Sequence, residues 1–320
     1  MSLLISLTNL IEATVIKRPS KIIKSPYVSD LKLENDINEE HLGHSPSLGC
    51  CGLADNGRKV LVQYIDTTKN KSKTKKDDSK LKCEYRIYCA IHQECINECI
   101  NEGINEGINE GMNEGINEGI NEGMNEEIIG IYPKLAEELF ENALNKNLIS
   151  KLMNIKEYKR ETKIFIEGHV DSRFDFSGID ENGTKFILEV KNVPLADYED
   201  LPEKERKKMD YSDRDFNSKV AYFPDGYRKS SKEPISVRAI KHLENLTYLK
   251  NLHKENMRCL ICFVIQRNDV ERFQPSVIDP NYVNALKNAH ENGVEIIALK
   301  IRWDRQGNSY FVSDKLPINI

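Results

Sequence analysis

The chain has 320 residues, 39% of them hydrophobic, and its formal net charge at pH 7 is −5. A chain of this length can bury one or two cores, and two domains are the better expectation. No window approaches 18 uncharged apolar residues, so we expect no membrane partner. Residues 1–16 lack the basic start of a secretion signal and contain Glu12, which predicts a folded first strand and a cytoplasmic or nuclear protein that is not secreted.

The eight cysteines do not follow the pattern of a secreted disulfide framework. Cys259 and Cys262 lie within an apolar run, and a zinc site would need a second such pair or two histidines at ligand spacing. Cys95 and Cys99 are poorly spaced for that purpose. We therefore predict buried thiols in a reducing compartment.

Residues 10–94 show an all-β pattern of short alternating runs separated by polar loops. Examples are EATVIK, RKVLVQYI and EYRIYCAI. The stretch Lys69–Lys82, KNKSKTKKDDSKLK, is a basic loop within this region. It is either a solvated loop or an arm that follows phosphates.

Residues 95–126 repeat a four-residue unit of Gly, Ile or Met, Asn and Glu. Each glycine costs a helix about 1 kcal/mol, so we expect a flexible or weakly helical insertion without catalytic residues. Residues 95–127 contain nine glutamates and no lysine or arginine, so removing them turns the net charge of −5 into +4. The acidic total therefore does not exclude a nucleic-acid partner.

A helix is predicted near Pro133–Met153, because Pro133 suits a first-turn position. Val170–Val193 then reads as two strands joined by a turn, with acidic residues where a core strand would be apolar. A two-residue Asn182-Gly183 loop would mix the faces. We predict instead an odd-length loop centred on Asn182, with Gly183 left-handed.

This second register sets Asp175 opposite Glu189, Arg173 opposite Lys191 and Phe174 opposite Val190. It gathers two carboxylates and an ammonium on one face, while the two phenylalanines, Phe174 and Phe176, pack on the other. Facing carboxylates repel unless a proton or cation lies between them. Oxygen ligands suit Mg²⁺ or Mn²⁺, and a nearby lysine can orient a water molecule for attack on a phosphodiester.

The polar stretches Ala196–Val220 and Gly226–Ser236 are predicted to be surface excursions. Cys259–Gln266 predicts a buried strand. Asp279 is placed to cap a helix through Glu291, and Val294–Ile301 predicts a further strand. The order of strand, helix and strand predicts a crossover connection beside the hairpin.

Several blocks of the sequence resemble a known family: EVKNVPL, AYFPD, KHLENL, FVIQRND and IDPNYVNALKNAHENGVEI. They closely resemble the sugar fermentation stimulation protein (SfsA) family, and Asp175 with Glu189-x-Lys191 resembles the signature of the PD-(D/E)xK nuclease superfamily. His44–Gly49 with Gly52, Leu53 and Gly57 resembles more loosely the family's N-terminal block, an OB-like barrel.

The resemblance implies an α/β (α+β) fold in three parts. These are an N-terminal OB-like β-barrel over 1–94, the repeat insert over 95–127 and a restriction-endonuclease-like mixed-sheet domain over 128–320. In the superfamily an acid from the leading helix often joins the metal. The family's usual glutamate aligns with Asn142 here, and Glu141 or Glu167 could substitute for it.

The resulting hypothesis is an SfsA-like DNA-binding protein that hydrolyses phosphodiester bonds. Asp175, Glu189 and the carbonyl of Val190 would hold Mg²⁺ or Mn²⁺, and Lys191 would position the water. The nucleic acid would meet a rim composed of Arg173, Asp225, Lys241, His242, Gln266 and Arg267. The alternative is a non-enzymatic DNA-binding regulator of sugar-utilisation genes that keeps a vestigial nuclease pocket. The sequence does not predict an oligomeric state.

Overall fold

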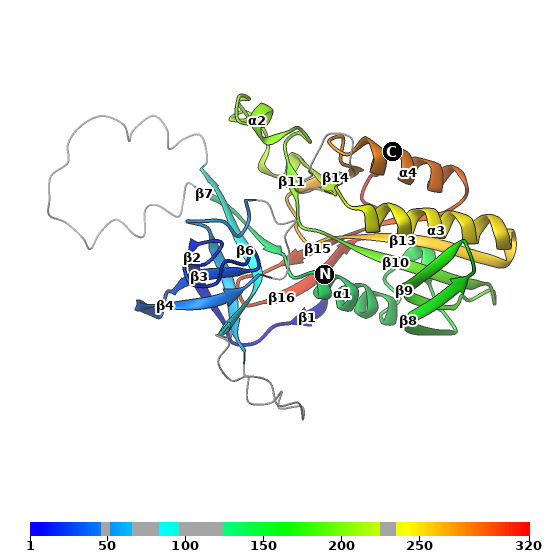
Figure 1. The fold of residues 1–320 in the computed structure, drawn as a ribbon, viewed down its shortest axis with the longest axis horizontal. Coiled ribbons are helices and arrows are strands. Elements are labelled where there is room, and N and C mark those ends of the chain that lie inside the picture. The colour runs from blue at the N-terminus through cyan, green and yellow to red at the C-terminus, as the bar shows by residue number, and fades with distance from the viewer. Residues whose placement is uncertain (46–51, 66–82, 96–123, 225–234) are drawn as a thin grey trace, which may run out of the picture.

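The computed structural model describes residues 1–45, 52–65, 83–95, 124–224 and 235–320 (Figure 1). In these ranges the chain builds a six-stranded sheet at one end of the molecule and a seven-stranded sheet with flanking helices at the other. A three-stranded sheet lies beside them. The basic loop, nearly all of the repeat, and Asp225 lie outside the described residues.

The six-stranded sheet curls on itself. Its order is β4-β3-β2-β5-β6-β7, and β4 also pairs with β6 at Gly43 and Tyr85. The strands are β2 (Leu10–Lys17), β3 (Val28–Leu33), β4 (Asp36–His44), β5 (Lys59–Tyr64), β6 (Tyr85–Cys95) and β7 (Met124–Gly130). Val60 and Val62 of β5 pack in its interior, as the period-two alternation requires. This ring of strands resembles an OB-like barrel, so that part of the predicted fold class is confirmed.

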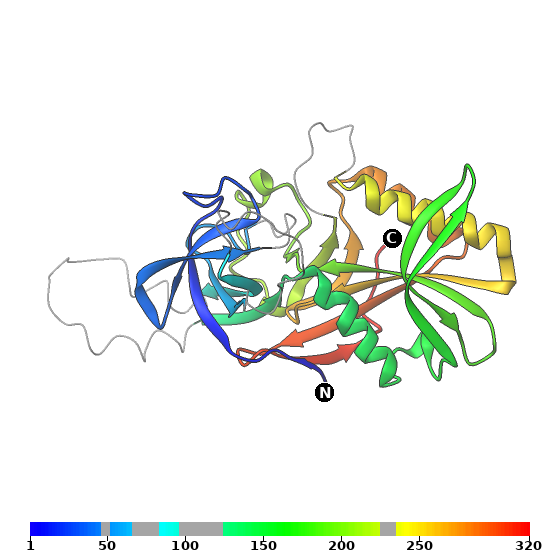
Figure 2. The ribbon, with the colours of Figure 1, turned by 60° about the horizontal axis from the view of Figure 1, so that its bottom comes forward.

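The seven-stranded sheet has the order β1-β16-β15-β13-β10-β9-β8 and mixes parallel with antiparallel pairs. Its strands are β1 (Ser2–Ser6), β8 (Glu157–Ile166), β9 (Val170–Ile179), β10 (Lys185–Val193), β13 (Met257–Ile265), β15 (Glu295–Trp303) and β16 (Asn308–Ser313). One face is covered by α1 (Pro133–Asn145), and the other by α3 (Val237–His253) and α4 (Pro280–Glu291) (Figures 1 and 2). The predicted mixed-sheet α/β layer is therefore confirmed.

Strand β13 shows how one sequence serves two cores. Leu260, Cys262 and Val264 pack with the apolar residues of α1, whereas Ile261 and Phe263 pack on the α3 and α4 side. Because side chains alternate along a strand, a continuous apolar run is what a strand covered on both faces needs.

The helices and strands follow most of the predicted bounds. Helix α1 begins at Pro133 but ends at Asn145, short of the predicted Met153, and Asn147 takes a positive φ of 53° just beyond it. Asp279 caps α4 by accepting a hydrogen bond from the backbone N–H of Tyr282. The thiols of Cys89, Cys259 and Cys262 are free and buried, as predicted.

The third sheet is built partly from a predicted surface excursion. Its order is β11-β12-β14, with β11 (Ala196–Asp197), β12 (Lys219–Phe223) and β14 (Val270–Pro275), and the short helix α2 (Glu203–Arg206) lies between its first two strands. Asp200 is buried and accepts hydrogen bonds from the Ser276 hydroxyl at 2.9 Å and the Val277 N–H at 2.7 Å. Lys219 is also buried. The excursion prediction is therefore wrong for both ends of Ala196–Val220, because buried polar partners hold them in the fold.

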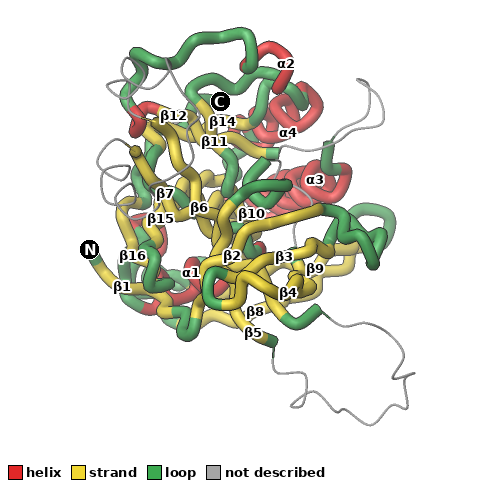
Figure 3. The backbone as a smooth tube through the Cα atoms, turned by 90° about the vertical axis from the view of Figure 1, so that its left-hand side faces the viewer, coloured by secondary structure: helices red, strands yellow, loops and turns green. Residues whose placement is uncertain are grey.

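Both larger sheets contain strands from the N-terminal half of the chain. Strand β1 pairs with β16 in the seven-stranded sheet, and β7 pairs with β6 in the barrel (Figure 3). The proposed domain limits at 94 and 127 therefore do not coincide with sheet membership. Among the described helices, none has the length and apolar character needed to cross a membrane.

Charged groups are buried where the barrel meets the rest of the chain. Glu127 of β7 accepts a hydrogen bond from the backbone N–H of Asn268 at 2.6 Å, and burial together with the charge of Asp269 raises the pKa of Glu127 to about 7. Between about pH 4.5 and 7, Glu127 therefore keeps its proton in the folded protein but loses it in the unfolded chain. This group's contribution to stability therefore falls as pH rises from about 4.5 to about 7.

We expect Glu127→Gln to remove that cost while keeping the acceptor for Asn268. At pH 8 the variant should be more stable than the parent protein by on the order of 2–3 kcal/mol, and at pH 5 the two should differ little. Urea unfolding at the two pH values measures the difference. Equal stability differences at pH 5 and pH 8 would show that Glu127 does not titrate in this way.

Candidate metal centre

The hairpin of β9 and β10 has the predicted register near its turn. Pairing runs from Lys185 opposite Ile179 to Leu188 opposite Phe176, which leaves a five-residue loop centred on Asn182. Gly183 has a φ of +85°, a conformation that glycine adopts without steric cost. The odd-length loop and the left-handed Gly183 are therefore confirmed.

Beyond Phe176 the two strands part. The backbone N–H of Val190 is taken by the side chain of Asp175, whose Oδ2 accepts it at 2.7 Å. In the neighbouring strand β8, Glu161 has a positive φ of 54°, which interrupts the regular alternation of side chains along β8. Phe176 packs on the α1 side and Phe174 on the α3 side. The prediction that both phenylalanines share one face is wrong, because the hairpin changes faces at Asp175.

Glu189 is the buried acid of the site, with 3% of its surface exposed. Its Oε1 meets the Lys191 ammonium, 2.5 Å away, and the Nδ1 atom of His242. Nδ1 also lies 3.2 Å from the Lys191 Nζ, and one ring nitrogen cannot both donate to Glu189 and accept from Lys191. The second oxygen, Oε2, is buried without a hydrogen-bond partner among the described residues.

The pKa values of the two carboxylates are shifted in opposite directions. Burial, reinforced by the charge of Glu189, raises the pKa of Asp175 to about 7. Burial also opposes ionisation of Glu189, but the hydrogen bond from His242 and the charge of Lys191 outweigh it and lower its pKa. The site therefore holds one firmly ionised carboxylate beside one that keeps a proton near neutrality unless a cation replaces it.

Helix α3 supplies the histidine and braces the hairpin. The helix begins after Ser236, whose hydroxyl accepts the N–H of Ala239. One turn beyond His242, the Asn245 amide donates to the Ser172 hydroxyl of β9 at 2.6 Å. His242 is 5% exposed and also meets the Phe174 ring, with centroids 6.4 Å apart. Side chains of α3 thus fix β9 and β10 relative to each other.

Arg173 and the two candidate substitute acids lie elsewhere. Arg173 faces Lys163 of β8 and pairs with Glu161 at 2.8 Å, so it does not oppose Lys191 as predicted; β9 has left β10 by that point. Glu141 accepts from the Arg160 guanidinium at 2.9 Å and the Tyr158 hydroxyl at 3.1 Å. Glu167 is exposed in the turn between β8 and β9.

The remaining rim residues divide between two places. Lys241 is exposed on α3, next to the buried His242. Gln266 is fully buried, where its amide donates to Asn192 at 2.6 Å and accepts from the Trp303 indole at 3.1 Å. Arg267 is buried against Asp269. Gln266 and Arg267 therefore lie at the junction with the barrel. Strand β7 contacts the chain at this point, where the Gly130 N–H donates to the Gln266 carbonyl at 2.9 Å.

Glu137 of α1 is an acid that the sequence reasoning did not single out. Its charge contributes to the raised pKa of Asp175, after burial and Glu189. It also pairs with Arg160 at 2.5 Å. Glu137 and Glu141 are four residues apart and so share a helix face. That spacing, counted from Pro133, is the signal by which the sequence could have shown Glu137.

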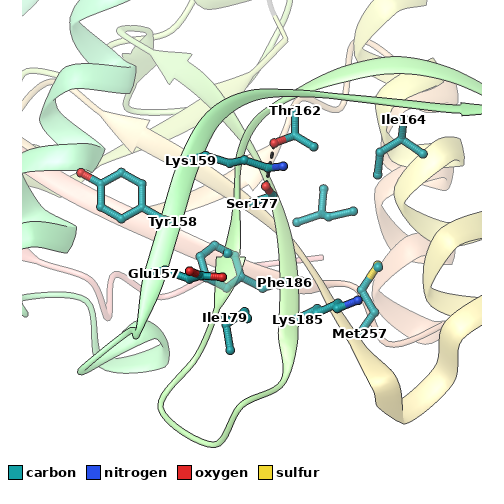
Figure 4. A pocket seen from close by; sticks show the side chains of 12 residues that line it. Glu157, Tyr158, Lys159, Thr162, Ile164, Ser177, Ile179, Lys185, Phe186 and Met257 are labelled. Carbon is teal, nitrogen blue, oxygen red and sulfur yellow. Dashed lines mark hydrogen bonds between the residues drawn. The ribbon is translucent and has the colours of Figure 1, made fainter.

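A separate pocket of about 430 Å³ lies along the β8–β9 hairpin and the first half of β10 (Figure 4). In Figure 4 the hydroxyls of Thr162 and Ser177 face each other across the two strands, 2.6 Å apart. Ile187 lines this pocket two residues before Glu189, but Asp175, Glu189 and Lys191 do not. It therefore adjoins the acidic pair without containing it.

A family model described as "Sugar fermentation stimulation protein RE domain" matches residues 134–307, more than half of the chain. The chain belongs to the SfsA family. The match includes Asp175, Glu189, Lys191 and His242 and begins after the barrel strands. The predicted family is therefore confirmed.

Curated SfsA relatives align with the same part of the chain. A sugar fermentation stimulation protein homolog of Shewanella frigidimarina (strain NCIMB 400) is 29% identical over 181 residues, 56% of this chain and 63% of that protein. One from Clostridium tetani (strain Massachusetts / E88) is 30% identical over 179 residues, 56% of this chain and 62% of its own length. The aligned region thus spans about three fifths of these relatives.

A solved SfsA structure has the same fold over the whole chain. It is the structure of Pyrococcus furiosus SfsA in complex with Ca²⁺, with a TM-score of 0.64, 18% identity and complete coverage of both chains. This likeness confirms the predicted arrangement of an OB-like barrel and a C-terminal mixed sheet.

Proposed function

We propose that this SfsA-family protein binds DNA and hydrolyses its phosphodiester bonds with Mg²⁺ or Mn²⁺. The observation that carries the proposal is the carboxylate pair of the half-buried Asp175 and the buried Glu189, at the point where β9 and β10 part. The charge of Glu189 helps to raise the pKa of Asp175, and the Glu189 Oε2 atom is buried without a partner. A divalent cation would satisfy that oxygen and neutralise the pair.

The donors around the pair fit a hard cation. Asp175, Glu189 and the carbonyl of Val190 would hold it. The Val190 N–H points to Asp175, and the carbonyl of a strand residue lies on the same strand edge as its N–H. Oxygen ligands of this kind suit Mg²⁺ and Mn²⁺. When bound, the cation would polarise the phosphodiester and lower the pKa of a water molecule.

Lys191 is the residue proposed to act on the reacting groups. Its ammonium lies 2.5 Å from Glu189 Oε1, and 13% of its side chain is exposed, so a phosphate can approach it. There the ammonium would orient the attacking water and stabilise negative charge on the phosphate oxygens. His242, bound to the same carboxylate, would hold Glu189 in place and can relay a proton. Glu137 adds negative potential from α1.

One set of contacts favours the alternative, a DNA-binding regulator without nuclease activity. The Asn142 side chain, at the family's usual glutamate position, donates to the Glu138 carbonyl of its own helix at 3.0 Å. Glu141 is engaged by Arg160. With neither residue turned to Asp175, the pocket would have fewer acids than an active site of this type, and the names of its relatives connect the family to sugar fermentation.

Incubation with single- and double-stranded DNA separates the two functions. We expect the protein to cleave DNA in Mg²⁺ or Mn²⁺, EDTA to abolish the cleavage, and Asp175→Asn to behave like the protein in EDTA. DNA that is retained by the protein but stays intact in both metals would support the regulator and contradict the nuclease.

A further inference from the structure

A second cavity lies between the barrel and the third sheet, with a volume of about 770 Å³. This is within the range of small-molecule sites and is large enough for a nucleotide. Arg18 and Arg58 line it from the barrel, and Arg206, Lys207 and Arg267 line it from the rest of the chain. The cavity is thus bounded by basic side chains on both sides.

The charge of the lining favours an anion. Of the five basic residues, Arg267 is already paired with the buried Asp269. Three acids also line the cavity: Asp55, Glu94 and Asp197. Two of the acids are engaged by arginines, with Arg206 pairing with Asp197 at 2.6 Å and Arg18 lying 3.7 Å from Asp55. Arg58 is exposed at the cavity, and within the described part of the chain its guanidinium has no hydrogen bond or ion pair.

Aromatic rings supply a second kind of surface. Tyr198 and Tyr211 stack with centroids 5.2 Å apart and an interplanar angle of 26°, and both line the cavity together with Tyr222. The Tyr211 hydroxyl is buried and has no hydrogen-bond partner among the described residues. A ligand entering the cavity would therefore meet aromatic side chains as well as cations.

We propose that this cavity, lined by Arg58, Lys207 and Tyr211, holds an unpaired stretch of a nucleic-acid strand. The proposal rests on the proposed function and extends it to the shape of the substrate. Phosphates would lie against Arg58 and Lys207, and a base against the Tyr211 ring. Basic grooves with stacking aromatics are the usual means of holding single strands. The same phosphate-and-base chemistry also occurs in a free mononucleotide.

The position of the cavity fits a strand that also reaches the acidic pair. Lys191 lies on β10, and Leu195, four residues farther along the same segment, lines the cavity. Four residues span at most about 14 Å, which roughly four stacked nucleotides cover at about 3.4 Å each. A single-stranded stretch of this length could therefore occupy both places.

Fluorescence anisotropy with a labelled 12-nucleotide single strand, in EDTA to keep it intact, tests the proposal. We expect Arg58→Glu and Lys207→Glu each to weaken binding about tenfold or more and to reduce the salt dependence. Tyr211→Ala should weaken binding about 5- to 100-fold, and Tyr211→Phe less, because it keeps the ring. Lys32→Glu reverses an exposed charge on a barrel strand that does not line the cavity at this residue, and it should bind like the parent.

The outcomes distinguish this inference from the proposed function. If the parent cleaves DNA but the cavity variants bind the strand as tightly as the parent, the inference is overturned and the proposed function stands. AMP binding can be measured by calorimetry. If Arg58→Glu loses AMP binding but binds the strand as before, the cavity belongs to a free nucleotide and the inference is overturned. A parent protein that binds no nucleic acid would remove both proposals. Thermal melting confirms that the variants fold, as expected for the exposed Arg58 and Lys207.

Discussion

Lys191→Ala is expected to lower the rate of metal-dependent DNA cleavage by about 10²- to 10³-fold, the usual loss when a preorganised group that stabilises transition-state charge is removed. The ammonium lies 2.5 Å from the Glu189 carboxylate at the parting of the two strands. Alanine leaves both carboxylates in place, so DNA binding should persist while turnover fails. Single-turnover cleavage of a labelled duplex in Mn²⁺, beside a binding assay in EDTA, measures both quantities.

Lys185→Ala is the matched control, because Lys185 is an exposed lysine at the start of the same strand. It should cleave at the parental rate. Equal cleavage by Lys191→Ala and the parent would remove Lys191 from the mechanism. Equal loss in both lysine variants would point to general weakening of DNA binding.

Asp269→Asn is expected to destabilise the fold by about 3–5 kcal/mol, the cost of leaving buried charge without its partner. Asp269 is fully buried, and its two oxygens accept from the Arg267 guanidinium at 2.6 Å each. The Lys219 ammonium lies 3.2 Å away and is itself buried. Although burial opposes ionisation, Arg267 and Lys219 lower the pKa of Asp269 to about 2. Asparagine keeps the shape but leaves the buried Arg267 without its charged partner, while Lys219 keeps Glu94 at 3.3 Å.

Urea unfolding at pH 7 measures this loss, and Glu161→Gln provides the comparison. Glu161 pairs with Arg173 at the surface, where both side chains are more than 60% exposed. Such pairs contribute less than about 1 kcal/mol. A loss of similar size in the two variants would mean that the buried cluster of Arg267, Asp269 and Lys219 contributes no more to stability than a surface ion pair.

The hairpin shows what the sequence could predict and what it could not. The loop centred on Asn182 followed from local turn chemistry, since glycine at position 183 accepts a positive φ. The parting of the strands at Asp175 did not follow, because it depends on packing from both sides of the sheet. Alternation along a single strand therefore placed Phe174 on the wrong face.

Residues far apart in the chain set the rest of the site. The contact between His242 and Glu189 joins positions 53 residues apart, and only the family resemblance brought them together in advance. Gln266 and Arg267 follow the end of β13. Strand β7 covers that end, and its pairing with the barrel could not be read from the repeat that precedes it. Glu137 was missed because α1 carries several acids, and the spacing that groups it with Glu141 does not show which of them acts on the pKa of Asp175.

The most direct test of the cation pocket is anomalous X-ray diffraction from a crystal soaked in MnCl₂. We expect a peak between the carboxylates of Asp175 and Glu189, within ligand distance of the Val190 carbonyl, that is lost in Asp175→Asn. A soaked crystal with no peak there, in which Glu189 contacts only Lys191 and His242, would contradict it.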